Sequence, residues 1–102
     1  MAILSDILYK VNLRAVTGST SVAITDVVTD SRMVTPGSCF IALKGTVVDG
    51  HDHIGAAATA GAIAVICEVM PAEVRDKVTY VQVADSSEAA GYVAHQFMGE
   101  PS

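Results

Sequence analysis

The chain has 102 residues, of which 51% are hydrophobic, so it is long enough for one domain with a buried core and its composition argues against disorder. Eleven acidic residues against six basic ones give a net charge of −5, which argues against a protein that grips nucleic acid, because that needs clustered Lys and Arg. No apolar run approaches the roughly 20 residues of a membrane span, and the first residues lack the features of a signal peptide. We therefore expect a cytoplasmic protein without a nucleic-acid or membrane partner.

The first half of the chain predicts one short helix followed by strands. The apolar residues of "ILSDILYK", residues 3–10, recur at the spacing of an amphipathic helix. Residues 13–32 are rich in Val, Ile and Thr around a Gly-Ser-Thr-Ser loop, which predicts two short strands, the second over residues 24–29. Pro36-Gly37 suits the central positions of a type II turn, and a strand, "CFIAL", follows it.

The second half predicts alternating helices and strands. An alanine-rich helix over residues 52–60 ends at Gly61, and the continuous apolar run "AIAVIC" after it is typical of a strand in a sheet that is covered on both faces. Residues 71–77 form a polar loop or short helix, residues 78–83 a strand, and residues 85–99 a helix capped by Asp85 or Ser86. This order predicts a single α/β domain with a small, mixed, mostly parallel sheet flanked by helices.

Two features suggest chemistry but have simpler explanations. Cys39 and Cys67 each lie in an apolar run, and we interpret them as buried free thiols in a reducing compartment, because no Cys and His set with zinc spacing is present. The stretch "VTGSTS", residues 16–21, lacks the ending of a phosphate-binding P-loop and reads as a loop between strands.

The stretch "DGHDHI" places Asp49, His51, Asp52 and His53 within five residues. The further His or Cys ligands of a metal site are absent nearby, so we expect no bound metal. The alternative is a tight turn at Asp49-Gly50, with His51 or Asp52 capping the following helix and leaving its first amides as a seat for phosphate.

The triplet Asp30-Ser31-Arg32 comes directly after the second predicted strand. A hydroxyl beside a guanidinium fork suits recognition of a planar, oxygen-rich group such as a pyrimidine or a phosphate. A strand end with an exposed serine and a surface ion pair explains the same residues, and both interpretations stay open. Because no nucleotide-triphosphate loop, nucleophile elbow, HExxH or paired-carboxylate signature is present, we expect no catalytic residue.

Residues 30–68, taken together, resemble the opening domain of the Mur ligase family. The family pattern is Asp-Ser-Arg, Pro-Gly, a Phe-containing strand, Gly, Asp-Gly-His, a helix, and Gly-Ala before a Val-rich strand, and all of these occur here in order. Ser31 and Gly50 favour the branch that adds a diamino acid as the third residue of the stem peptide. The branch that adds D-alanyl-D-alanine more often shows Asp-Thr-Arg and Asp-Ala-His.

The resemblance implies that this chain is the first domain of a longer, ATP-dependent amide ligase of peptidoglycan biosynthesis. In that family the first domain holds the uridine diphosphate end of UDP-N-acetylmuramoyl-L-alanyl-D-glutamate, the central domain binds ATP and magnesium, and the last domain takes the amino acid. We therefore expect this chain to be inactive alone and to hold no cofactor itself. The implied substrate-binding residues are Thr29, Ser31, Arg32, Thr46, Val47, Val48, Asp49, Gly50 and His51.

Three alternatives stay open from the sequence. The added residue is meso-diaminopimelate or lysine, which a domain outside this chain would decide. The chain could instead come from the D-alanyl-D-alanine-adding branch. A stand-alone module that binds a protein through a sheet edge is the alternative outside the family.

Overall fold

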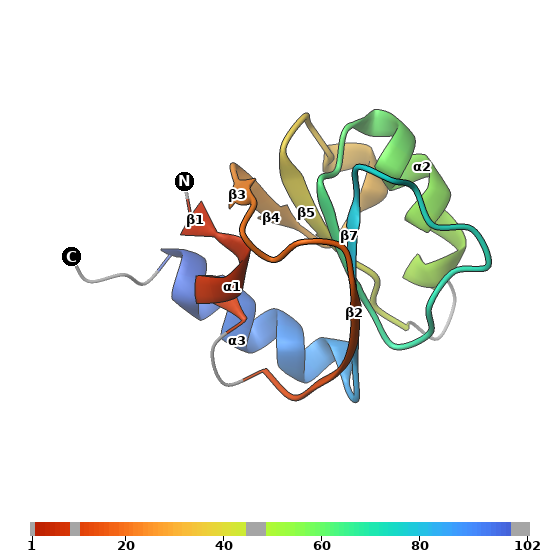
Figure 1. Ribbon diagram of the computed structural model, residues 1–102. Coiled ribbons are helices and arrows are strands. Elements are labelled where there is room, and N and C mark those ends of the chain that lie inside the picture. Colours follow the sequence, from red (N-terminus) through yellow and green to blue (C-terminus); the bar gives the residue numbers. More distant parts are fainter. Residues whose placement is uncertain (1, 9–10, 45–48, 99–102) are drawn as a thin grey trace.

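The computed structural model describes residues 2–8, 11–44 and 49–98, and its centre is a five-stranded sheet (Figure 1). The strand order is β2-β7-β6-β5-β4. Strands β4 to β7 run parallel, and β2 is antiparallel to β7 at one edge. The bounds are β2 Leu13–Thr17, β4 Asp26–Val28, β5 Ser38–Ile41, β6 Ala64–Cys67 and β7 Thr79–Val83. The predicted mixed, mostly parallel sheet is confirmed.

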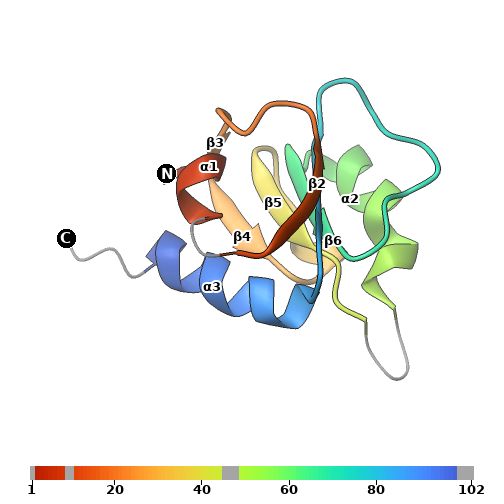
Figure 2. The same ribbon diagram turned by 60° about the horizontal axis from the view of Figure 1, so that its bottom comes forward.

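Helices cover both faces of this sheet (Figures 1 and 2). One face carries α1 (Leu4–Ile7) and α3 (Ser86–Met98), and the other carries α2 (Ile54–Ala60). Because strand side chains alternate between faces, Cys39 and Ile41 of β5 pack toward α1 and α3, while Phe40 packs toward α2. All four residues of β5 and of β6 are buried, and for β6 the continuous apolar run "AIAVIC" predicts this.

A second, two-stranded sheet alters two predicted elements. It pairs β1 (Ala2–Ile3) with β3 (Ala23–Ile24) in antiparallel fashion. The helix predicted from residue 3 therefore begins only at Leu4 and, as described, ends at Ile7. The strand predicted over residues 24–29 is also wrong, because Thr25 separates β3 from β4 and donates its N–H to the carbonyl of Gly37 at 3.0 Å.

The predicted turns and helix ends agree with the structure. The N–H of Ser38 donates to the carbonyl of Thr35 at 3.0 Å, and Gly37 has a φ of 92°, as a type II turn requires. Gly61 ends α2 with a φ of 117°. Asp85 caps α3 by accepting from the N–H groups of Ser87 and Glu88 at 3.0 and 3.1 Å.

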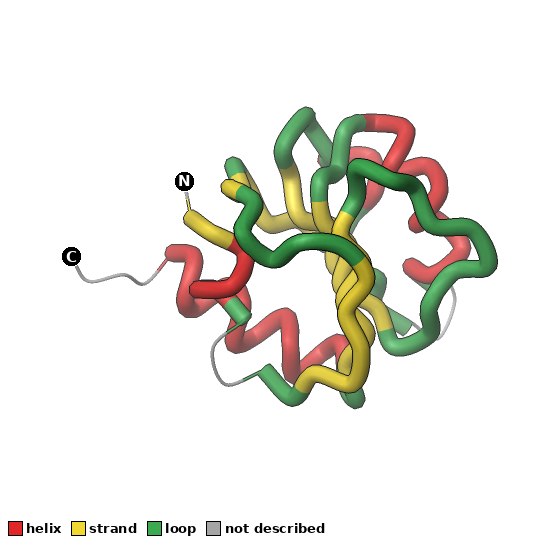
Figure 3. Tube along the Cα trace, in the orientation of Figure 1, coloured by secondary structure: helices red, strands yellow, loops and turns green. Residues whose placement is uncertain are grey.

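The connections between the parallel strands lie mostly on the α2 side. A 3-10 turn, η1 (Ser31–Met33), follows β4, and a second one, η2 (Gly50–His53), leads into α2. Residues 68–78 between β6 and β7 form one long loop (Figure 3), so the loop alternative for residues 71–77 is confirmed. Within the described residues, none of the helices combines the length and apolar character needed to cross a membrane.

Candidate functional site

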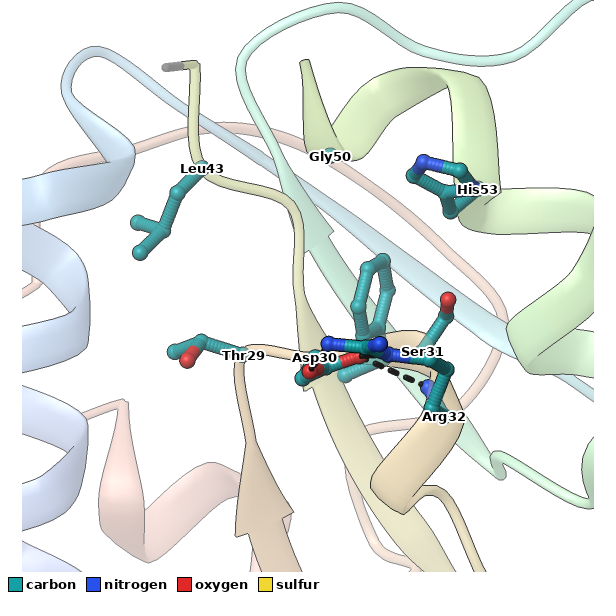
Figure 4. Close-up of a pocket in the computed structure, with 8 residues that line it drawn as sticks. Thr29, Asp30, Ser31, Arg32, Leu43, Gly50 and His53 are labelled. Atoms are coloured by element: carbon teal, nitrogen blue, oxygen red, sulfur yellow. Dashed lines mark hydrogen bonds and ion pairs between the residues drawn. The ribbon is translucent and has the colours of Figure 1, made fainter. Parts of the chain in front are cut away.

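A cavity of about 700 Å³ opens at the carboxyl ends of β4 and β5 (Figure 4). Ligands of open α/β sheets bind at this end of the strands, and the volume is within the range of small-molecule sites. The cavity is lined by Thr29, Asp30, Ser31, Arg32, Phe40, Leu43, Gly50 and His53. Two segments that are 18 residues apart in sequence, around Arg32 and around Gly50, therefore form its opposite walls.

Asp30 organises the first wall. Its carboxylate caps η1 by accepting from the N–H of Arg32 at 2.9 Å. The same carboxylate accepts from Nε of Arg32 at 3.1 Å and from Nη2 at 2.8 Å, which is the bidentate geometry of a guanidinium fork. These side-chain bonds, followed by the backbone bond, lower the pKa of Asp30 to about 2, and the carboxylate in turn raises the pKa of Arg32.

Ser31 is half-buried in the same wall. Figure 4 shows its hydroxyl directed to the side on which His53 lies, with Asp30 and Arg32 beside it. The hydroxyl is therefore neither buried in the core nor turned away from the second wall. Donor, acceptor and cation lie together on three consecutive residues, as recognition of a planar polar group requires.

The second wall depends on a close approach at Gly50. Its N–H donates to the carbonyl of Leu43 at 2.7 Å. A Cβ at Gly50 would lie 2.7 Å from the backbone nitrogen of Leu43 and 3.1 Å from Cα of Ala42. Glycine therefore lets η2 lie directly against the chain that leaves β5.

The cap of this second turn differs from the prediction. Asp49, and not His51 or Asp52, accepts the first free amide of η2, the N–H of His51, at 2.9 Å. The predicted turn at Asp49-Gly50 is present, but the prediction of the capping residue was wrong. The cause is the extended backbone of Asp49, which places its carboxylate under the turn.

His51 is bonded through both ring nitrogens within the protein. Nδ1 lies 2.7 Å from a carboxylate oxygen of Asp49, and Nε2 accepts from the N–H groups of Glu68 at 2.9 Å and Val69 at 3.3 Å. Only 14% of its side chain is exposed, and it does not line the cavity. Contact of His51 with a ligand stays a prediction, and neither ring nitrogen is left to make it.

The predicted binding residues therefore fall into three groups. Thr29, Ser31, Arg32 and Gly50 line the cavity, while Asp49 and His51 support its second wall from behind. Thr46, Val47 and Val48 lie outside the described residues. The predictions for all nine as ligand contacts stay untested.

Four lining residues were not among the predicted binding residues: Asp30, Phe40, Leu43 and His53. A signal for His53 was present, because residues i and i+3 eclipse each other in a 3-10 turn and His53 is three residues after Gly50. Phe40 could have been placed by strand alternation, which sets it opposite Cys39 and Ile41.

The two thiols belong to the core. Cys39 and Cys67 are both free and buried, and they pack on opposite faces of the sheet. Burial raises the pKa of Cys39 to about 12 and that of Cys67 to about 11. A thiol in this state is a poor nucleophile, so the predicted structural role is supported.

Comparison with known proteins identifies the family of the chain. The family described as "Mur ligase family, catalytic domain" matches residues 23–98. The UDP-N-acetylmuramoyl-L-alanyl-D-glutamate–2,6-diaminopimelate ligase of Bacteroides fragilis is 46% identical over 97% of this chain and 20% of the relative. The protein of the same name from Cytophaga hutchinsonii is 44% identical over 97% of this chain and 21% of the relative. The chain thus spans about a fifth of the length of these relatives.

Solved structures of MurF, another member of the Mur ligase family, also match this chain. MurF ligase from Thermotoga maritima, in complex with ADP, matches with a TM-score of 0.62 and 32% identity over 72% of this chain and 17% of that one. MurF from Acinetobacter baumannii matches with a TM-score of 0.61 and 29% identity over 72% of this chain and 16% of that one. By its family match, its curated relatives and its fold, the chain belongs to the Mur ligase family.

Proposed function

We propose that this chain is the substrate-binding domain of a peptidoglycan-precursor ligase and that its cavity holds the uridine diphosphate end of UDP-N-acetylmuramoyl-L-alanyl-D-glutamate. The observation that carries the proposal is the cavity at the carboxyl ends of β4 and β5, where the wall around Ser31 faces the wall around Gly50. The names of the relatives from Bacteroides fragilis and Cytophaga hutchinsonii contain the same substrate, which supports this choice of ligand.

The lining residues suit a nucleotide end. Asp30 accepts from two N–H groups of the Arg32 guanidinium and leaves the others for a ligand. The Ser31 hydroxyl can donate to or accept from a uracil edge, and the ring of Phe40 supplies an apolar surface. Because Asp30 offsets the charge of Arg32, the cavity has little net positive charge, which favours recognition of a uridine over recognition of a bare phosphate.

The share of this chain in catalysis is to anchor the substrate far from the reacting carboxylate. Binding energy gained at a remote handle offsets the entropy lost when the reacting groups are brought together. Within the described ranges, no three His, Cys, Asp or Glu side chains gather as a metal site. From the resemblance to the family, we place ATP and Mg²⁺ on parts of the ligase outside this chain, assign no chemical step to its residues, and expect the chain alone to be inactive.

The added residue is best taken as 2,6-diaminopimelate, because the names of the curated relatives specify it. The solved structures bring in the D-alanyl-D-alanine-adding enzyme, MurF, as the second candidate. The residues Ser31 and Gly50 disfavour it, because that branch more often shows Asp-Thr-Arg and Asp-Ala-His at these places. A cytoplasmic location is part of the proposal and fits the two free buried thiols.

Titration of the ¹⁵N-labelled chain with UDP tests this function. We expect amide shifts to cluster at residues 29–32 and 50–53, and Ser31→Ala to weaken UDP binding by about two- to tenfold, the cost of one hydrogen bond. Ser87→Ala, at an exposed serine of α3, is the matched control and should bind like the parent. Shifts confined to the edge strand β2 would instead support a protein-interaction module and contradict the proposal.

A further inference from the structure

A continuous line of hydrogen bonds crosses the carboxyl end of the sheet behind the cavity. It begins at Asp49, passes through the ring of His51 to the N–H of Glu68, and continues from the Glu68 carboxylate to Ser86. In the last step one carboxylate oxygen accepts from the Ser86 N–H at 2.8 Å and from its hydroxyl at 3.1 Å. The line joins the start of η2, the end of β6 and the first turn of α3.

The bonds of His51 fix the position of its proton. Two backbone N–H groups, from Glu68 and Val69, point at Nε2, and an N–H can only donate, so Nε2 must carry a lone pair. The ring proton is then on Nδ1, where it donates to the carboxylate of Asp49 at 2.7 Å. The neutral Nδ1–H tautomer is the only ring state that satisfies all of these contacts.

The same bonds fix the second wall of the cavity. Asp49 both caps η2 and anchors His51, and Gly50 lies against Leu43, so the turn is held from two sides. Glu68 cannot shift freely to follow the turn, because its carbonyl accepts from Nε2 of Gln82 at 3.0 Å while its carboxylate holds Ser86. The position of the wall that contains Gly50 and His53 therefore depends on His51.

We propose that His51 is a positioning residue: as the neutral Nδ1–H tautomer it ties the Gly50–His53 wall to the end of β6 and so keeps the cavity in its binding shape. The effect on ligand rests on the proposed function, whereas the tautomer and the anchored wall do not. This role differs from direct contact with the substrate, because both ring nitrogens are bonded inside the protein.

Three variants separate the role of the ring from its volume. His51→Phe keeps a ring of similar size but removes the acceptor for the Glu68 N–H and the donor to Asp49. His51→Gln keeps a polar end that can reach the Glu68 N–H. His95→Phe makes the same exchange at an exposed histidine of α3 and serves as the matched control.

The first measurements need no ligand. In the parent chain at neutral pH, the ¹⁵N shift of the His51 Nε2 should be that of a nitrogen with a lone pair and the shift of Nδ1 that of a protonated nitrogen. In His51→Phe, hydrogen exchange at the amides of Glu68 and Gly50 should speed up by about tenfold or more, because the half-buried Glu68 N–H loses its acceptor and the turn that contains Gly50 loses its anchor. His51→Gln should restore part of the protection, and His95→Phe should match the parent.

The ligand arm uses UDP as the probe. The dissociation constant should rise about tenfold in His51→Phe, partly recover in His51→Gln, and stay unchanged in His95→Phe. An Nε2–H tautomer in the parent, or unchanged exchange at Gly50 in His51→Phe, overturns the inference even where UDP binds. Failure of the parent to bind UDP, with the tautomer and exchange results as expected, overturns the proposed function and leaves the positioning role supported.

Discussion

The two ends of the parallel strands are both hollowed, but their polar groups are used differently. The carboxyl end has the cavity of about 700 Å³ around Ser31 and Gly50. The amino end has one of about 570 Å³ lined by residues 37, 58, 61–63 and 75–78. The two cavities are therefore similar in volume. They differ in the hydrogen bonds that their polar lining residues make.

At the amino end the lining arginine, Arg75, serves the fold. Nη2 of Arg75 donates to the hydroxyl of Thr59 at 2.9 Å and to the carbonyl of Gly55 at 3.4 Å, which ties the loop before β7 to α2. At the carboxyl end, Arg32 is bonded to Asp30 only two residues away and stays 87% exposed. Because, among the described residues, Arg32 bonds only within its own turn, it links no distant elements, and its remaining N–H groups can bind a ligand.

The largest expected effect is at the amino end. Gly61→Ala should lower the free energy of unfolding by about 2–4 kcal/mol, because residue 61 has a positive φ and a new Cβ would lie 2.8 Å from Cα of Pro36. Urea unfolding measures the change. Gly91→Ala is the control, since a Cβ there meets nothing within 4 Å and should stabilise α3 by about 0.5–1 kcal/mol. The folded fraction of Gly61→Ala should still bind UDP like the parent.

Gly50→Ala should affect both stability and binding. We expect a loss of about 1–3 kcal/mol, because the new methyl group would meet the backbone of Leu43. The shift of η2 that relieves this contact should also weaken UDP binding, which calorimetric titration measures. Equal UDP affinity in Gly50→Ala and the parent would contradict the claim that the carboxyl-end cavity binds the nucleotide.

The two arginines allow a direct comparison of ligand binding. Arg32→Ala should raise the UDP dissociation constant about tenfold, the effect of losing hydrogen bonds from a charged group, with little change in stability. Arg75→Ala should leave UDP affinity unchanged while it weakens the contact between α2 and the loop before β7. A larger loss of affinity in Arg75→Ala than in Arg32→Ala would assign the nucleotide to the other cavity.

The smallest expected effect is the pH dependence at Asp30. Its pKa is lowered from 3.8 to about 2, so its contribution to stability is present above the unfolded value and is lost as the pH falls through about 2. Carboxyl ¹³C titration should show this low value in the parent and a rise toward 3.8 in Arg32→Ala. The rise should be incomplete, because the backbone N–H of residue 32 still donates to the carboxylate.

Local features of the fold were predictable, and long-range partners were not. Gly37, Gly61 and Asp85 each act within a few residues of the turn or helix end that they define, so their roles follow from residue type and spacing. The break between β3 and β4 at Thr25 depends on Gly37, twelve residues away, and on the pairing of β3 with β1.

In the candidate site, too, local features could be predicted from the sequence and long-range partners could not. For the Asp30-Ser31-Arg32 triplet the sequence predicted either a recognition element or a strand end with a surface ion pair, and the bonds observed there are local. The role of His51 was not predicted, because its partner Glu68 is 17 residues away, directly after the end of β6. The pattern "DGHDH" shows a turn followed by a helix, and the spacing of Gly50 and His53 is a signal that both lie on one side of the turn. Nothing within the pattern shows that His51 holds the turn to the end of β6.

A crystal structure of the chain grown with UDP tests the central claim most directly. We expect UDP in the carboxyl-end cavity, between residues 29–32 and 50–53, with an atom of the nucleotide within hydrogen-bond distance of the Ser31 hydroxyl. UDP ordered at the amino-end cavity beside Arg75 and Lys77, or no bound UDP at a concentration that saturates the chain in solution, would contradict it.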